Sequence, residues 1–296
     1  MKIFRQLPAS VHYLFLIGIA ATCLSCHAVM AKHLSASVAW PTLVFVRAFV
    51  TLLLLKVFFL REPIAWTKNK GVWGRSIFGS LFVCFFYIAL SQIPTPDVLA
   101  IISTSPMWVA ILYWINFKKK PTPAFWFAVS SMLVGAAIFD QVIRPDNTWG
   151  ITFAILAVIS AAIGTFSIEY CREFKSTVIT FHLMVALLLL GLIAGVIQGR
   201  FLSNLWDVEV ESWLGLIAMS VFALGYQLSM VSAAKTGGAI SASFAIVLGV
   251  LITSAFDILI SGFDLQRSIA TFLVIVPCLL LFSGVISIPS RANTVA

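Results

Sequence analysis

The sequence predicts an all-α integral membrane protein with ten transmembrane helices. Of the 296 residues, 61% are hydrophobic and 10% are charged, whereas an ordinary globular domain carries about 25% charged residues. The apolar residues gather in separate runs of about 20, the length of helix that crosses the ~30 Å hydrocarbon core of a bilayer. Because lipid offers the backbone no hydrogen-bond partner, such runs must be helical. This composition excludes a soluble enzyme, a secreted disulfide scaffold and a disordered chain.

Ten apolar segments follow one another with short connections between them. The longest connection, at 198–211, is too short for a soluble domain. The first segment follows Lys2 and Arg5, as in a signal peptide, but it is long and lacks a small-residue cleavage site, which favours a retained helix. The ten segments are 13–31, 38–60, 72–92, 97–117, 123–140, 149–169, 177–197, 212–234, 238–260 and 268–288.

The lysines and arginines alternate between the two ends of these segments. With a cytoplasmic N-terminus, fourteen of them, including Arg75, fall on or near the cytoplasmic side, and four fall on the other side. This excess is the positive-inside signal, and it predicts cytoplasmic N- and C-termini in the cell inner (plasma) membrane. The net charge of +8 is then explained by the basic residues of the cytoplasmic loops, and no nucleic-acid partner is expected.

The two halves of the chain predict an inverted repeat. Residues 1–145 and 146–296 each contain five segments. Because five is odd, the second half crosses the membrane in the opposite orientation to the first. The third segment ends with Tyr87–Gln92, and the eighth ends with Ser232–Gly237, close to half the chain length away. Secondary transporters place the substrate near the bilayer midplane between such repeats.

Five short motifs occur in a particular order along the chain. They are Phe45–Phe49 around Arg47, Tyr87–Leu90 followed by Ile93-Pro94, Leu99–Pro106, Met132–Gly135 and Ala233–Gly237. In their order and spacing they resemble the drug/metabolite transporter superfamily, in its ten-helix EamA-type branch. The resemblance covers nearly the whole chain. It implies transport of small metabolites by alternating access, through a cavity lined mainly by the first, third, fourth, sixth, eighth and ninth segments.

Two polar residues stand out inside the first two segments. Arg47 lies well inside an apolar segment, where a charge is costly and has to face protein or water. We predict that it binds substrate or pairs in a gate, and a structural arginine that bonds carbonyls or snorkels outward is the alternative. His27 lies at a comparable height, and we predict that it binds substrate or takes up protons. The alternative for His27 is a histidine used only in helix packing.

Carboxylates offer one further candidate for proton coupling. Asp257 interrupts the ninth segment, where burial would raise a carboxyl pKa, although Asp264 and Arg267 nearby equally suit an interfacial residue. Glu169 and Glu173 at the end of the sixth segment are expected to form a solvated cluster with neighbouring basic residues.

Aromatic and small polar residues are predicted to line the substrate cavity. Each of them also has an ordinary structural reading, as a membrane-interface aromatic or as a contact between helices. Pro106 is expected to kink its helix and serve as a hinge. The predicted lining residues are Tyr87, Ser103, Trp108, Tyr226 and Gln227.

No cofactor or metal is predicted. Cys23–His27 spell the C-x-x-C-H pattern of haem attachment, but a lipid-embedded helix is the wrong context for it. The five cysteines are odd in number and lie mostly in apolar segments, so we expect them to be unpaired. Lys235-Thr236 has no glycine-rich loop before it, so ATP binding is not expected and transport would use a gradient or exchange.

The predicted function is that of a secondary transporter for a small organic metabolite, such as an amino acid, amine, nucleoside or adenosyl-type compound. The expected partners are this substrate and the lipid bilayer. Gly191, Gly195 and Gly199 favour close helix packing, within a monomer or in a homodimer. A polytopic membrane enzyme and a non-transporting receptor or scaffold are the alternatives; the first lacks a recognisable nucleophile–base or metal motif, and the second lacks an extramembrane signalling domain.

Overall fold

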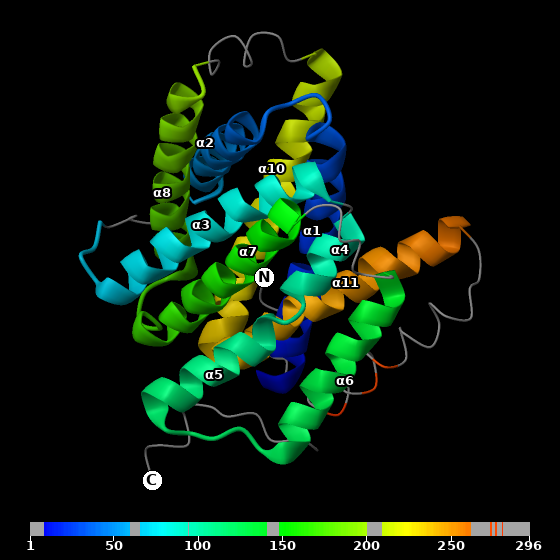
Figure 1. Ribbon diagram of the computed structural model, residues 1–296. Helices are drawn as coiled ribbons and strands as arrows, with labels where there is room; N and C mark the ends of the chain where they lie inside the picture. The colour runs from blue at the N-terminus through cyan, green and yellow to red at the C-terminus, as the bar shows by residue number, and fades with distance from the viewer. Residues whose placement is uncertain are drawn as a thin grey trace.

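The computed structural model describes residues 9–59, 66–93, 95–140, 148–199 and 209–261, together with residues 273, 276 and 280. Within these residues all regular structure is helical (Figure 1). The predicted tenth segment, 268–288, lies outside the described residues except for the three single positions. The elements in chain order are α1 (Ala9–Leu34), α2 (Trp40–Phe58), α3 (Lys70–Gln92), α4 (Thr95–Ile102), α5 (Ser105–Phe117), α6 (Pro123–Asp140), α7 (Thr148–Ser167), the 3₁₀ turn η2 (Ile168–Tyr170), α8 (Ser176–Ile197), α10 (Val210–Gly237) and α11 (Ala239–Ser261).

Six stretches of the described chain are long and apolar enough to cross a bilayer, and the protein is a multi-pass membrane protein. Their outward surfaces carry large apolar side chains, among them Phe58, Ile197 and Leu214. Such surfaces suit lipid, since hydrocarbon makes no demand for polar groups. The six stretches are His12–Leu34, Trp40–Phe58, Lys70–Gln92, Thr148–Tyr170, Ser176–Ile197 and Val210–Gly237.

The predicted single helix over 97–117 is wrong, because two helices, α4 and α5, occupy this stretch. The amide of Ser103 donates to the carbonyl of Leu99 at 2.8 Å and ends α4, and the amide of Met107 donates to the carbonyl of Thr104 at 3.0 Å and begins α5. Pro106 lies in the first turn of α5. Proline has no amide hydrogen to donate to the preceding turn, and its ring clashes with the carbonyl four residues earlier, so the helix breaks upstream and restarts with Pro106 in its first turn.

The long helices run between two ends of the bundle. At the Leu34 end, α1, α3 and α8 finish and α2, α7 and α10 begin; the close approach of Gly150 to Ile93 and of Gly215 to Leu34 brings these termini together. At the Gly237 end, α2, α7 and α10 finish and α3, α8 and α11 begin. We use these two names for the ends below.

The helices pair in a regular pattern. The most extensive contacts join α3 to α7, α1 to α10 and α2 to α8, and further contacts join α1 to α11 and α3 to α8. In Figure 1, α8 and α2 lie on one side of the bundle, and α6 and α11 lie on the other. The two buried polar clusters described below are formed by side chains of α1, α2, α3 and α10.

Glycines allow two of these pairs to approach closely. A Cβ atom on Gly164 of α7 would lie 3.1 Å from the amide nitrogen of Gly79 in α3, and one on Gly191 of α8 would lie 2.9 Å from the amide nitrogen of Phe45 in α2. Gly191 thus serves packing within one chain, which is one of the two uses expected for it. Gly199 lies beyond the end of α8 with φ +67° and does not extend the helical row of glycines.

Candidate functional site

Three residues predicted from the sequence meet in one buried cluster. The hydroxyl of Tyr87 on α3 lies 3.1 Å from Nε2 of His27 on α1, and Nη1 of Arg47 on α2 lies 3.3 Å from the same hydroxyl. Nδ1 of His27 lies 3.4 Å from the carbonyl oxygen of Met219 on α10. Each of the three side chains is 1% exposed. Four helices therefore share one polar junction, which we call the His27 cluster.

The hydrogen bonds of the His27 cluster have one consistent direction. The guanidinium of Arg47 can only donate, so the hydroxyl oxygen of Tyr87 accepts from it. The Tyr87 hydroxyl then donates to Nε2 of a neutral His27, whose Nδ1–H donates to the carbonyl of Met219. Arg47 also lies over the ring of Tyr87, 5.8 Å from its centroid. The cluster can therefore hold a buried positive charge in place without a carboxylate.

A second buried cluster lies closer to the Gly237 end, and its arginine was not predicted as a site residue. Nη2 of Arg75 on α3 donates to Oε1 of Gln227 on α10 at 2.7 Å and lies 3.6 Å from the sulfur of Met230. Arg75 is 2% exposed and Gln227 is 1% exposed. The sequence assigned Arg75 to the cytoplasmic charges because it lies near the start of its segment. We call this group the Arg75 cluster.

Of the remaining predicted lining residues, Tyr226 lies beside the Arg75 cluster, whereas Ser103 and Trp108 lie in the stretch of α4 and α5, from which neither cluster as defined above takes a residue. Tyr226 is buried in α10 beside Gln227, and Ser103 is buried at the break between α4 and α5. Trp108 on α5 is half-buried, packs where the two apolar cores of the protein meet, and donates from its indole nitrogen to the hydroxyl of Thr104 at 3.2 Å. Pro106 lies just beyond the helix break. Asp257 belongs to α11, but its side chain lies outside the described residues.

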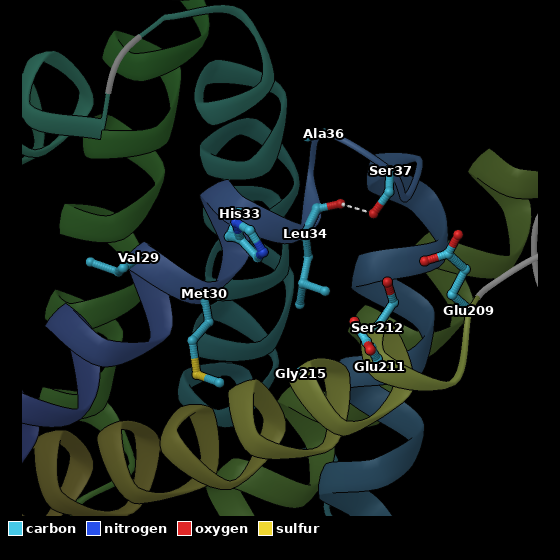
Figure 2. A pocket seen from close by; sticks show the side chains of 10 residues that line it. All are labelled: Val29, Met30, His33, Leu34, Ala36, Ser37, Glu209, Glu211, Ser212 and Gly215. Carbon is cyan, nitrogen blue, oxygen red and sulfur yellow. Dashed lines mark hydrogen bonds between the residues drawn. The ribbon is translucent and has the colours of Figure 1, made fainter.

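A pocket of about 550 Å³ opens at the Leu34 end, between the last turns of α1 and the first turns of α10 (Figure 2). Met30, one helical turn after His27, and Gly215, one turn before Met219, both line it. The pocket is therefore the outward continuation of the seam that holds the His27 cluster. Glu209 and Glu211 lie at its edge and give it a negative charge.

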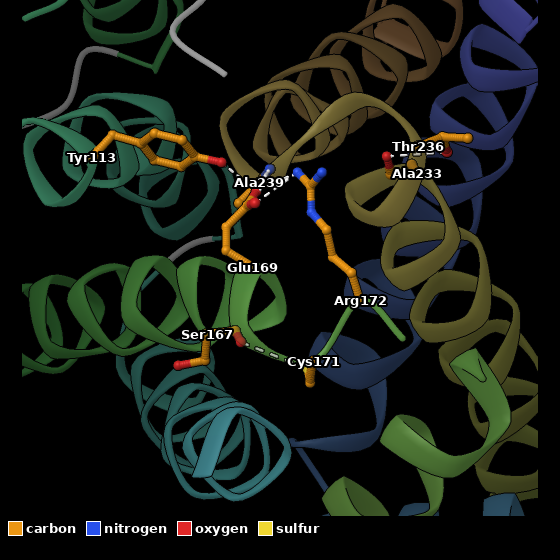
Figure 3. A network of polar contacts seen from close by, with 8 residues as sticks. All are labelled: Tyr113, Ser167, Glu169, Cys171, Arg172, Ala233, Thr236 and Ala239. Atoms are coloured by element: carbon orange, nitrogen blue, oxygen red, sulfur yellow. Dashed lines mark hydrogen bonds and ion pairs between the residues drawn. The ribbon is translucent and has the colours of Figure 1, made fainter. Parts of the chain in front are cut away.

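A buried carboxylate ties several elements together at the Gly237 end (Figure 3). Glu169 of η2 accepts hydrogen bonds from the hydroxyl of Tyr113, from the backbone amide of Ala239 at 2.8 Å and from Nη2 of Arg172 at 2.8 Å. Arg172 also forms an ion pair with it at 2.7 Å. The Glu169 side chain is fully buried, so the prediction of a solvated cluster is wrong for this residue.

The position of Glu169 has a clear physical reason. Its carboxylate accepts from the first backbone amide of α11, where unpaired amides and the helix dipole favour a negative charge. Gly238, with φ +92°, allows the sharp turn from α10 into α11 that presents this amide. The Glu169 network thus fastens α5, α7 and α11 to one another at this end.

Two lysines and a cysteine complete the ends of the bundle. At the Leu34 end, Nζ of Lys32 donates to the carbonyls of Leu90 at 2.6 Å and Ile93 at 3.1 Å. At the Gly237 end, Nζ of Lys235 donates to the carbonyl of Phe174 at 2.6 Å.

Cys171, in the loop after η2, is fully buried, and this burial raises the pKa of its thiol to about 12. Its side chain is therefore a protonated, shielded thiol at neutral pH.

The histidine of the Cys23–His27 motif, which matches the haem-attachment pattern, is already in contact with protein atoms. Both ring nitrogens of His27 face protein atoms, as described above. Cys23, Cys26, Cys84 and Cys171 are all free thiols. Among the residues that the structure describes, no group of three or more histidine, cysteine or acidic side chains could hold a metal ion.

Comparison with known proteins finds a family match over part of the chain and a solved structure of similar fold. Residues 12–139 match the EamA-like transporter family. A solved structure described only as the crystal structure of a protein superimposes with a TM-score of 0.71; it is 14% identical in sequence, and the match covers 90% of this chain and 95% of that one. At this identity the likeness concerns the fold alone. No sequence among curated proteins matches the chain.

Proposed function

We propose that this chain, whose residues 12–139 match the EamA-like transporter family, belongs to the drug/metabolite transporter superfamily and is a secondary transporter of a small organic metabolite. It moves its substrate by alternating access, driven by a gradient or by exchange. The substrate belongs among amino acids, amines, nucleosides or adenosyl-type compounds.

One observation carries this proposal: a pocket opens toward the buried polar groups at the Leu34 end of the described helices. Its lining residues Met30 and Gly215 lie one helical turn from His27 and Met219 of the His27 cluster. At the other end, the Glu169 network and Lys235 fasten neighbouring elements together. A carrier that works by alternating access has this asymmetry in each of its two states, and exchange of the open and closed ends moves the substrate.

Helix contacts support two inverted repeats, residues 1–145 and 146–296, with ten spans in all. If α7, α8 and α10 correspond to α1, α2 and α3, then the pairing of α1 with α10 has its counterpart in that of α7 with α3. Likewise, the pairing of α3 with α8 has its counterpart in that of α10 with α2. The excess of lysine and arginine places the Gly237 end in the cytoplasm, together with both termini, and the pocket opens outward.

Within this proposal each site residue has a role. Arg47, His27 and Tyr87 bind substrate or gate its passage at the inner limit of the outward pocket, and the neutral His27 is placed to take a proton. Tyr226, Gln227, Ser103 and Trp108 line the path beyond them. The break before Pro106 gives α4 and α5 a bending point. Asp257 stays a second candidate for proton coupling.

The proposal is tested first by a screen for substrate binding and then by a measurement of substrate flux. Purified protein is screened by thermal unfolding against amino acids, amines, nucleosides and adenosyl compounds, because a ligand of the native state raises its apparent stability. A compound that stabilises the protein is then loaded into liposomes containing it, and exchange against the labelled compound outside is measured. We expect flux that saturates with concentration and is absent from protein-free liposomes.

The same experiment separates the alternatives. Stabilisation without flux would contradict transport and favour a receptor or scaffold. Recovery of the compound in chemically altered form would favour a membrane enzyme.

A further inference from the structure

Two arginines lie inside the membrane-spanning part of the bundle. Arg47 on α2 and Arg75 on α3 are 1% and 2% exposed and belong to the stretches Trp40–Phe58 and Lys70–Gln92. A charged side chain at such a place is costly and marks substrate or ion pathways. Twelve residues separate Arg75 from Tyr87, the partner of Arg47, which is about 18 Å along α3 at 1.5 Å per residue. The two arginines are therefore anchored at different levels of one interior, and their guanidinium groups remain within electrostatic range of each other.

In the part of the chain that the structure describes, neither guanidinium is paired with a carboxylate. The ion pair between Arg172 and Glu169 involves neither of these arginines. Arg47 donates instead to a phenol, and Arg75 donates to an amide oxygen and faces a thioether. The buried Nε atom of each has no hydrogen-bond partner among the described residues. Within this part of the chain, two buried positive charges thus lack the counter-charge that normally compensates burial.

Two glycines make room for the guanidinium of Arg75. A Cβ atom on Gly164 of α7 would lie 3.3 Å from Nη1 of Arg75, and one on Gly79 of α3 would lie 3.7 Å from it, so the guanidinium packs directly against both helices. Tyr226 on α10 lies within electrostatic range of both arginines. Polar groups from α2, α3 and α10 therefore lie near one another inside the bundle.

We propose that Arg47 and Arg75 are successive binding points for a single anionic group of the substrate, a carboxylate or a phosphate. Tyr87 and Gln227 hold the two guanidinium groups while the carrier is empty, and the anion replaces them because a charge-assisted, bidentate contact is stronger than a contact with a neutral acceptor. The anion occupies Arg47 while the bundle is open at the Leu34 end and passes to Arg75 when the bundle opens at the other end. This inference rests on the proposed transport function and narrows it to a substrate with a negative group.

The experiment uses pairs of compounds that differ in one charge. Thermal unfolding of the purified full chain is measured with L-glutamate and L-glutamine, with succinate and succinamide, and with adenosine monophosphate and adenosine. The first two pairs test a carboxylate and the third tests a phosphate. We expect the charged member of at least one pair to stabilise the protein and its neutral partner to have no effect.

Variants then connect this binding to the arginines. Arg75→Gln is expected to weaken the apparent affinity for the anion about tenfold or more, since a charge-assisted contact is lost. Arg75→Lys keeps the charge without the planar fork and is expected to give an intermediate affinity. Lys70→Gln removes one exposed positive charge from the same helix and is the matched control, with unchanged affinity.

Three results would overturn the inference. These are stabilisation by neutral members as strong as by anions, absence of stabilisation by every anion, and unchanged anion affinity in folded Arg75→Gln and Arg75→Lys proteins. Saturable flux of a neutral compound would in that case leave the transport function intact. Anion binding without flux would instead retain the arginine site and remove the transport function.

Discussion

The hydroxyl of Tyr87 on α3 lies 3.1 Å from Nε2 of His27 on α1, and this contact joins two helices inside the bundle. The same hydroxyl accepts from Arg47 on α2. One phenol oxygen therefore satisfies a buried acceptor on one side and a buried cation on the other, so its removal affects both.

Tyr87→Phe is expected to lower the free energy of unfolding by about 1–3 kcal/mol, because it leaves a buried histidine nitrogen and a buried guanidinium short of a partner. Flux should fall as well. Unfolding in detergent and exchange in liposomes measure the two effects. Tyr170→Phe, at an exposed tyrosine, is the matched control and should change both quantities little. Equal effects of the two substitutions would contradict the role given to the His27 cluster.

Arg47→Ala is expected to abolish transport while the protein still inserts into the membrane. The reason is that the guanidinium belongs to the buried His27 cluster, whereas the apolar helix around it directs insertion. Membrane yield and elution on size exclusion report insertion, and liposome exchange reports transport. Lys56→Ala, an exposed cation on the same helix, should leave both intact. Normal exchange by Arg47→Ala would rule out its functional role.

Gly191→Ala is expected to destabilise the protein by about 1–3 kcal/mol through overpacking. The new methyl group would lie 2.9 Å from the backbone nitrogen of Phe45, so α2 and α8 would have to separate. Gly18→Ala is the control, since a Cβ atom there meets nothing within 4 Å. That change should be neutral or stabilise by roughly 0.5–1 kcal/mol, as in other helices. Similar melting curves for the two variants would contradict the close approach of α2 and α8.

Cys171 is expected to react slowly with a maleimide when Cys23, Cys26, Cys84 and Cys278 are replaced by alanine. Its pKa is raised to about 12, so the reactive thiolate is scarce at pH 8 and its fraction grows about tenfold per pH unit up to that value. An exposed thiol, with a pKa near 8.5, levels off much earlier.

Two variants calibrate the Cys171 measurement. Lys175→Cys places a thiol at an exposed position of the same loop and should react quickly at pH 8. Glu169→Gln removes the charge that fastens the Gly237 end and should speed the reaction of Cys171 by opening that end more often. Equal rates with and without Glu169 would show that its network does not hold this end closed.

Within the described residues, helix positions followed closely from local properties of the chain, with one exception. Runs of about 20 apolar residues have to be helical in lipid, and α2, α3, α7 and α8 lie within a few residues of the predicted segments. The break between α4 and α5 was missed because Ser103 and Thr104 interrupt the apolar run only briefly. Pro106 was the available signal, and its effect is larger than the predicted kink.

Arg75 and Glu169 show that a position near a helix end does not decide whether a charged side chain is buried. The positive-inside rule depends on the end of a helix near which a charge lies, and both residues lie near helix ends. Burial depends instead on the direction in which the side chain points around the helix axis. That direction is decided by the packing of α3 against α7 and α10, and by the turn at Gly238 that brings the amide of Ala239 to Glu169.

By itself, the sequence determined the membrane class, most of the described helical segments and the resemblance to a transporter family, and it singled out Arg47, His27 and Tyr87 as candidates. These properties depend on composition, on the length of apolar runs and on the cost of a polar group in lipid, all of which are local. The tertiary structure decided which of these residues touch, that Arg75 joins Gln227, and that a pocket lies at the Leu34 end while Glu169 fastens the other. Such contacts join residues up to 152 positions apart, and only the packing of whole helices brings them within hydrogen-bond distance.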